Sequence, residues 1–144
     1  MPASFQFLED VALADLAFDA EGDSIQELFE AASSAVMEAM ADPATVGAIW
    51  ERRMEHADGD LAALLFEWLS DLVYWKDAAG VVFSRAEVSL IREGDIWKLV
   101  GTLSGEPVNQ TTQVLRDDVK GVTKHLYRLH QDHGRWRVRV VLDV

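Results

Sequence analysis

The sequence contains no cysteine, which excludes disulfide bonds, zinc–thiolate sites and a thiol nucleophile. It has no apolar run of the roughly 18 residues that a membrane-spanning helix needs, and residues 1–20 show no basic segment followed by an apolar one. We therefore expect a cytoplasmic protein with no secretory signal and no membrane contact. Basic residues are also scarce, with 13 Lys and Arg against 25 Asp and Glu and a net charge of −12. This balance argues against direct nucleic-acid binding and favours cations or basic protein surfaces as partners.

The composition is that of a folded domain. Hydrophobic residues make up 49% of the 144 residues, which is too high for a disordered chain and enough for one sizeable core. No repeat, low-complexity segment or linker divides the sequence. We therefore expect residues 1–144 to form a single domain.

Two segments have the apolar spacing of amphipathic helices. The first begins after Ser24, the N-cap of a capping box that Glu27 completes, and ends at Asp42-Pro43. The second begins after the N-cap residue Asp60 and ends at Gly80. The stripe of the second helix, which we expect to be buried, consists of Leu61, Leu64, Leu65, Trp68, Leu69, Leu72 and Val73.

The remaining segments have the patterns of strands and turns. Strands are expected at residues 14–19, 45–55, 81–83, 87–91, 96–103, 119–129 and 136–142. Hairpin turns are expected at 92–95 and 130–134, a further turn at 21–22, and a polar connection at 104–116. These elements predict an α+β fold with an antiparallel or mixed β-sheet and two amphipathic helices.

The end of the sequence carries oxygen ligands of the kind that bind hard cations. The apolar face of the last strand consists of Trp136, Val138, Val140 and Leu142. Alternation therefore places Asp143 on the polar face, and the same rule places Asp15 on the polar face of its own strand. Asp143 also lies beside the carboxylate of Val144, and adjacent carboxylates suit Ca²⁺, Mg²⁺ or Mn²⁺. A solvated, frayed terminus is the alternative.

Several segments, taken in order and spacing, resemble the archease family over residues 5–144. The closest likeness is at the end, where Val-Val-Leu-Asp-Val at 140–144 is similar to the family's terminal Val-Ile-Leu-Asp-Val/Ile. The Val-Lys-Gly-Val-Thr segment at 119–123 resembles its Val-Lys-Ala-Val-Thr stretch. The other similar segments are residues 5–8, 14–15, 22–32 and 80–84.

The resemblance implies an archease-like fold and a non-enzymatic accessory role. Archeases promote guanylylation of the active-site histidine of the GTP-dependent tRNA-splicing RNA ligase and allow its multiple turnover. Carried over to this chain, the family's metal ligands are Asp15, Asp143 and Val144, and Lys120 is a further functional residue. The implied cofactor is a divalent metal, first of all Ca²⁺, with Mg²⁺ or Mn²⁺ as alternatives. The implied partner is the RNA ligase.

The chain departs from the family pattern in two places. Ala12-Leu13 stand where the family has His-Thr, directly before Ala14-Asp15. Residues 109–113 contain neither the arginine nor the histidine that the family carries in that region. Groups around the ligands commonly contribute about tenfold or more of the metal affinity. The departures therefore favour a diverged branch with weaker metal binding or a different partner.

Two other functions are compatible with the residues. One is a diverged binding module that keeps the fold without the ligase role. The other is a metal-dependent phosphoester hydrolase that uses Asp15 and Asp143. His130 and His133 lie in an expected turn, where histidines are mostly solvated, so we expect no metal there. Salt bridges to neighbouring strands are expected for Arg135, Arg137 and Arg139.

Overall fold

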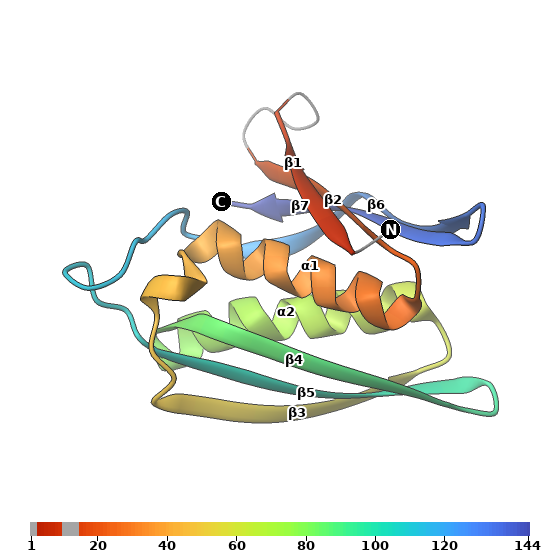
Figure 1. Cartoon of the computed structure of the whole chain (residues 1–144), viewed down its shortest axis with the longest axis horizontal. Coiled ribbons are helices and arrows are strands. Elements are labelled where there is room, and N and C mark those ends of the chain that lie inside the picture. The colour runs from red at the N-terminus through yellow and green to blue at the C-terminus, as the bar shows by residue number, and fades with distance from the viewer. Residues whose placement is uncertain (1–2, 10–14) are drawn as a thin grey trace.

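The computed structural model describes residues 3–9 and 15–144, and these form two antiparallel sheets with two α-helices between them (Figure 1). In chain order the elements are β1 (Ser4–Leu8), β2 (Leu16–Gly22), α1 (Ile25–Met40), η1 (Pro43–Thr45), β3 (Trp50–Asp58), α2 (Leu61–Ala79), β4 (Val81–Glu93), β5 (Ile96–Pro107), β6 (Gly121–Asp132) and β7 (Arg135–Asp143). One sheet has the order β1-β2-β7-β6 and the other β3-β5-β4. The predicted α+β class and the two helices are confirmed.

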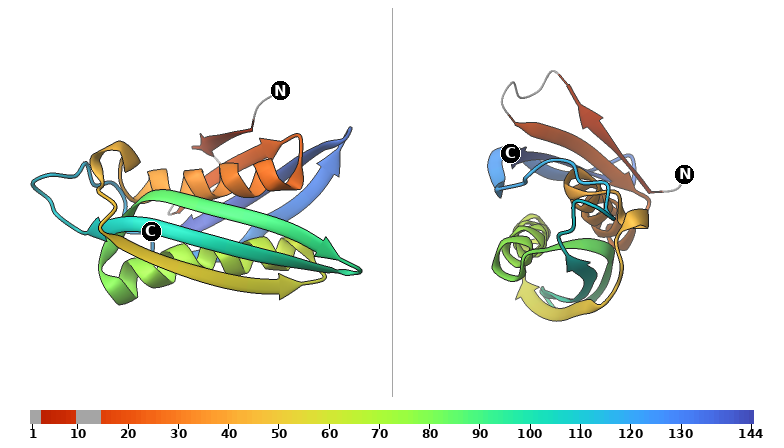
Figure 2. Two further views of the ribbon diagram at one scale, coloured as in Figure 1. Left: turned by 60° about the horizontal axis from the view of Figure 1, so that its bottom comes forward. Right: turned by 90° about the vertical axis from the view of Figure 1, so that its left-hand side faces the viewer.

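The two helices lie between the two sheets, so each helix is covered on both sides (Figures 1 and 2). α1 packs mainly against β2 and β4, and α2 packs against β6 and against β3 and β5. A helix between two layers needs apolar residues around most of its circumference. One hydrophobic cluster accordingly joins both helices to both sheets. Leu65 and Trp68 of α2 are fully buried in it, as predicted.

The helix bounds follow from the capping residues that the sequence predicts. The Ser24 hydroxyl accepts from the Glu27 N–H at 3.1 Å, and the Glu27 carboxylate accepts from the Asp23 N–H at 3.2 Å. The Asp60 carboxylate accepts from the Ala62 N–H at 3.0 Å. Gly80 ends α2 with φ of 64°, a left-handed conformation that glycine adopts without steric cost.

The indole of Trp68 joins three elements at the centre of the core. Its Nε1–H donates to the Ser33 hydroxyl of α1 at 2.7 Å, and that hydroxyl donates to the Phe29 carbonyl at 2.6 Å. On the other side the ring packs against β5 at Gly101, where an added Cβ would lie 2.2 Å from the Trp68 ring. The missing side chain at Gly101 therefore allows α2 to approach the sheet.

Several strand bounds differ from those predicted. Glu21 and Gly22 belong to β2 and pair with β7, so residues 21–22 form no turn. The strand expected at 45–55 begins only at Trp50, because Pro43–Thr45 form a 3-10 turn that Asp42 caps. β4 continues through residues 84–86 with an irregularity in its pairing, since its neighbour β5 runs alongside for the whole length.

The hairpin turns are shorter than predicted. β6 continues to Asp132, and the turn consists of His133 and Gly134 with φ of 51° and 78°. Two residues with positive φ match the twist of a tight antiparallel hairpin, which explains why the strands extend further than the polar sequence indicates. The connection expected at 104–116 is also shorter, because β5 reaches Pro107. None of the helices in the described part of the chain is long and apolar enough to span a membrane.

Candidate functional site

The two predicted acidic ligands lie at the same end of the four-stranded sheet. The pairing of β2 with β7 ends at Leu16 and Leu142. Asp15 directly precedes Leu16 and Asp143 directly follows Leu142, so each acid lies one residue beyond the last pair. Neighbouring strands are about 4.7–4.9 Å apart. The fold thus brings together two acids from opposite ends of the chain, Asp15 half-buried and Asp143 exposed.

The start of β6 adds Lys120 to the same end of the sheet. Gly121 is the Cα partner of Asp143, and the backbone N–H of Lys120 donates to the Asp143 carbonyl at 2.7 Å. An added Cβ on Gly121 would meet nothing within 4 Å, so the surface beside Asp143 is open. Lys120 is exposed and Val144 is half-buried. We call this group the sheet-end site; it consists of Asp15, Lys120, Asp143 and Val144.

An ion pair from α2 holds the segment that leads to Lys120. Buried Lys76 donates to the Asp118 carboxylate at 2.5 Å and contacts Asp77 at 3.0 Å. Burial by itself would lower the pKa of Lys76, but the hydrogen bonds to Asp118 and Asp77 raise it. The hydrogen bond and charge of Lys76 hold the pKa of Asp118 below its usual value, with a smaller contribution from Lys120. Sequence reasoning missed this pair because its members are 42 positions apart and match no motif.

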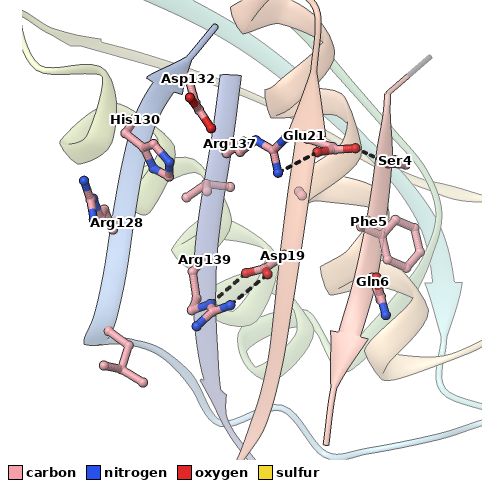
Figure 3. Close-up of a pocket in the computed structure, with 13 residues that line it drawn as sticks. Ser4, Phe5, Gln6, Asp19, Glu21, Arg128, His130, Asp132, Arg137 and Arg139 are labelled. Carbon is pink, nitrogen blue, oxygen red and sulfur yellow. Dashed lines mark hydrogen bonds and ion pairs between the residues drawn. The ribbon is translucent and has the colours of Figure 1, made fainter. Parts of the chain in front are cut away.

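Cross-strand ion pairs cover the outer face of the same sheet. Arg139 of β7 makes two hydrogen bonds to the Asp19 carboxylate of β2, at 2.8 and 2.9 Å (Figure 3). Glu21 of β2 contacts Arg137 and Arg135, each at 3.3 Å. The predicted polar face of the last strand and its salt bridges to a neighbouring strand are confirmed.

The sheet-end site has few ligand groups, and all of them are oxygens. No cluster of three or more His, Cys, Asp or Glu side chains that could hold a metal is found in residues 3–9 and 15–144. The hard donors at the site are the carboxylates of Asp15 and Asp143 and the main-chain oxygen of Val144, which is ligand chemistry that suits Ca²⁺ or Mg²⁺. Ala12 and Leu13, which replace the His-Thr of the family motif, lie outside the described residues.

The prediction that His130 lies in a solvated turn is wrong. His130 belongs to β6, opposite Arg137, because the strands continue to the two-residue turn. It is half-buried, and its Nδ1 atom is shielded from solvent without a hydrogen-bond partner among the described residues. His133 does lie in the turn and is exposed, with Nδ1 3.1 Å from the Asp132 carboxylate.

Fold and site together define a small α+β protein whose two helices lie between antiparallel sheets, with acids gathered where β2 begins and β7 ends. The family model described as the Archease protein family matches residues 5–144. The chain belongs to the archease family. This confirms the resemblance and the predicted fold.

Individual relatives agree with the assignment over nearly their whole length. Protein archease of Methanothermobacter thermautotrophicus is 35% identical over 140 residues, covering 97% of this chain and 98% of that protein. The solution structure of protein 1598 of Methanobacterium thermoautotrophicum is 33% identical with a TM-score of 0.80, covering 97% of this chain and 98% of that one. The crystal structure of an archease of Thermotoga maritima, described as a possible chaperone, has a TM-score of 0.62 at 20% identity, covers 92% of this chain and 93% of that one, and shows a likeness of fold alone.

Proposed function

We propose that this protein is a non-catalytic accessory factor that promotes guanylylation and multiple turnover of a tRNA-splicing RNA ligase. The observation that carries the proposal is the meeting of β2, β6 and β7 at the sheet-end site in a chain of the archease family. All four positions that match the family's functional residues lie in this one region. The net charge of −12 suits contact with a protein partner better than contact with RNA itself.

In this proposal Asp15 and Asp143 bind a divalent cation together with a main-chain oxygen of Val144. Ca²⁺ takes about 6–8 oxygen ligands, so water or groups of the partner complete the coordination. When bound, the cation supplies a concentrated positive charge that attracts an anionic group. Because Ala12 and Leu13 replace a histidine and a threonine, we expect weaker metal binding than in a site with both groups.

Lys120 contributes a second positive charge at the same place. Its backbone is held by the hydrogen bond to Asp143, and Asp118, two residues earlier, is held by Lys76. The side chain itself is exposed and can reach a partner. A lysine presented in this way binds a phosphate as a compact charge with three donors.

The accessory role is tested with the RNA ligase of the same organism. GMP transfer from radiolabelled GTP to the ligase is counted over repeated turnovers, with and without this protein. Wild type should stimulate the transfer, and Lys120→Ala should abolish stimulation while leaving the free energy of unfolding unchanged. Lys98→Ala removes an exposed lysine on the other sheet and should stimulate like wild type. Full stimulation by Lys120→Ala would remove that residue from the site, and no stimulation by wild type would overturn the function.

Metal binding is tested separately by calorimetry with Ca²⁺, Mg²⁺ and Mn²⁺. Asp15→Asn and Asp143→Asn should each weaken binding at least about tenfold, because each removes a charged ligand. Asp95→Asn, in the β4–β5 turn, is the matched control and should leave the affinity unchanged. Stimulation of the ligase without metal binding would refute the metal site alone. Metal binding without stimulation would instead favour the diverged binding module, and metal-dependent phosphoester cleavage that Asp15→Asn abolishes would favour a hydrolase.

A further inference from the structure

The outer face of the four-stranded sheet carries a pocket that the proposed function does not use. Its volume of about 740 Å³ falls in the range of small-molecule sites, about 300–1,000 Å³. Side chains from β1, β2, β7 and β6 line it (Figure 3). Arg139, at the edge of this outer-face pocket, lies four residues from Asp143 along β7, about 13 Å at the usual strand rise.

Basic residues stand opposite each other between β6 and β7 in the outer-face pocket. Arg128 is the Cα partner of Arg139, and His130 is the Cα partner of Arg137. Like charges directly opposite on one face destabilise an antiparallel pair. The opposed arginines Arg128 and Arg139 therefore need compensating negative charge.

The acids of β2 form ion pairs with the arginines of β7 but not with Arg128 of β6. Asp19 makes two hydrogen bonds to Arg139, and Glu21 contacts Arg137 at 3.3 Å. Figure 3 shows both arginines directed from β7 toward these acids of β2. Arg128 has no ion-pair partner within residues 3–9 and 15–144. The positive charge on the β6 side of the pocket thus remains uncompensated by the protein.

Two local features of β6 point to a ligand at the same place. The Nδ1 atom of His130 is shielded from solvent without a partner among the described residues, so the ring offers its other nitrogen, Nε2, to the pocket that His130 lines. Leu126 also lines the pocket, with φ of 57°, a conformation that is rare for a bulky residue and gathers at ligand sites. The one acid on the β6 side, Asp132, contacts His133 of the turn at 3.1 Å.

We infer that the outer-face pocket binds a small phosphate-bearing molecule, with the phosphate held by Arg128 and His130 beside Arg137. The guanidinium of Arg128 presents a planar fork of donors that matches phosphate oxygens, and a ring N–H of His130 adds a further donor. A phosphate between β6 and β7 removes the repulsion between Arg128 and Arg139. Exposed Leu126 supplies apolar surface for an organic part of the ligand.

The inference is tested by NMR titration of the ¹⁵N-labelled protein with inorganic pyrophosphate and, separately, with AMP. Both titrations contain EDTA, so that no divalent cation contributes. Backbone amide signals of β6 and β7 around Arg128 and His130 should shift with each probe. Tighter binding of AMP identifies an organic phosphate as the ligand class, and equal or tighter binding of pyrophosphate identifies an inorganic one. Shifts confined to other regions would overturn the inference, and so would the absence of any shift with either probe at about 10 mM.

Substitutions then separate this pocket from the sheet-end site. Arg128→Gln removes an exposed side chain and should weaken binding at least tenfold, and His130→Gln should weaken it severalfold. Arg85→Gln, an exposed arginine on the other sheet, is the matched control and should bind like wild type. Asp143→Asn should also bind like wild type, because it affects the proposed metal site only. Unchanged affinity in Arg128→Gln, or an equal loss in Arg85→Gln, would refute the assignment.

Discussion

The two sheets share the same helices on their inner faces but differ in how their outer faces are held together. On the three-stranded sheet, two ion pairs join residues two positions apart in one strand, and the pair of Lys98 with Glu93 joins strands only across the β4–β5 hairpin, five positions apart. On the four-stranded sheet, ion pairs join neighbouring strands, such as Arg139 and Asp19, which are 120 positions apart. The pairs within strands are Arg53–Glu55 at 3.0 Å and Arg85–Glu87 at 2.6 Å.

The sheets also differ at their borders. The side-chain amide of Gln26 in α1 donates to the Val88 carbonyl and accepts from the Leu90 N–H at 3.1 Å, so one side chain occupies the edge of β4. In the four-stranded sheet, pairing of β2 with β7 stops just before Asp15 and Asp143. The comparison indicates that the three-stranded sheet satisfies its own groups locally. The four-stranded sheet leaves charged groups available to ligands and partners.

The largest effect should come from the helical layer that both sheets share. Leu65→Ala should lower the free energy of unfolding by about 2–5 kcal/mol, because Leu65 is fully buried between the layers and truncation leaves a cavity. Glu67→Gln, on the exposed face of the same helix, should change it by less than about 0.5 kcal/mol. Chemical denaturation measures both. A loss below about 0.5 kcal/mol for Leu65→Ala would mean that the helix does not join the sheets as described.

Two glycines, one in each sheet, give the next contrast. A Cβ on Gly101 would lie 2.2 Å from the Trp68 ring, so Gly101→Ala should destabilise by about 1–3 kcal/mol, as overpacking does. A Cβ on Gly121 would meet nothing within 4 Å, so Gly121→Ala should leave thermal stability nearly unchanged. The melting temperatures of the two variants test the difference. Equal losses would show that α2 packs less closely on β5 than described.

The outer-face ion pairs should have smaller effects. Asp19→Asn removes the partner of a doubly hydrogen-bonded arginine and should cost about 0.2–1 kcal/mol, less at high salt. Glu87→Gln breaks a pair between exposed side chains within one strand and should have no measurable effect. Denaturation at low and high salt compares them. A larger salt-dependent loss for Glu87→Gln would reverse the contrast between the two faces.

The smallest expected effect is a pH dependence near Lys120. Lys76 lowers the pKa of Asp118 in the folded protein, so their pair stabilises above the unfolded pKa of about 3.9 and is lost as pH falls through the folded value. Asp118→Asn should therefore reduce the acid-induced loss of stability, whereas Asp117→Asn, its exposed neighbour, should not. Thermal melts between neutral and acid pH measure the slope. An unchanged slope in Asp118→Asn would show that the pair does not hold this segment.

The elements with local causes could be predicted from the sequence. Ser24, Asp60 and Gly80 set the helix bounds through contacts within a few residues or through a single φ angle, and all three are confirmed. Strand lengths were harder to predict, because residues 84–86 and 130–132 lack an apolar pattern and are strands only through their partners. A strand's length depends on the neighbouring strand, which the local pattern does not contain.

The candidate site likewise has features that the sequence predicted and features that it did not. Alternation predicted that Asp15 and Asp143 lie on polar faces, and the family resemblance singled out Lys120; the metal and ligase roles remain predictions. Neither source indicated the pair of Lys76 with Asp118. That contact depends on how α2 packs against the segment before β6, and packing between distant segments has no signature in either one.

The sequence by itself determined the helix caps, the class of fold, the polar face of the last strand and membership of the archease family. Only the tertiary structure decided that the strands form two sheets, that Lys120 is hydrogen-bonded to Asp143, and that Arg128 stands opposite Arg139. The physical reason is register. A slip of one residue would move every side chain of a strand to the other face, so register is decided by all the contacts of the strand with the core and its neighbours.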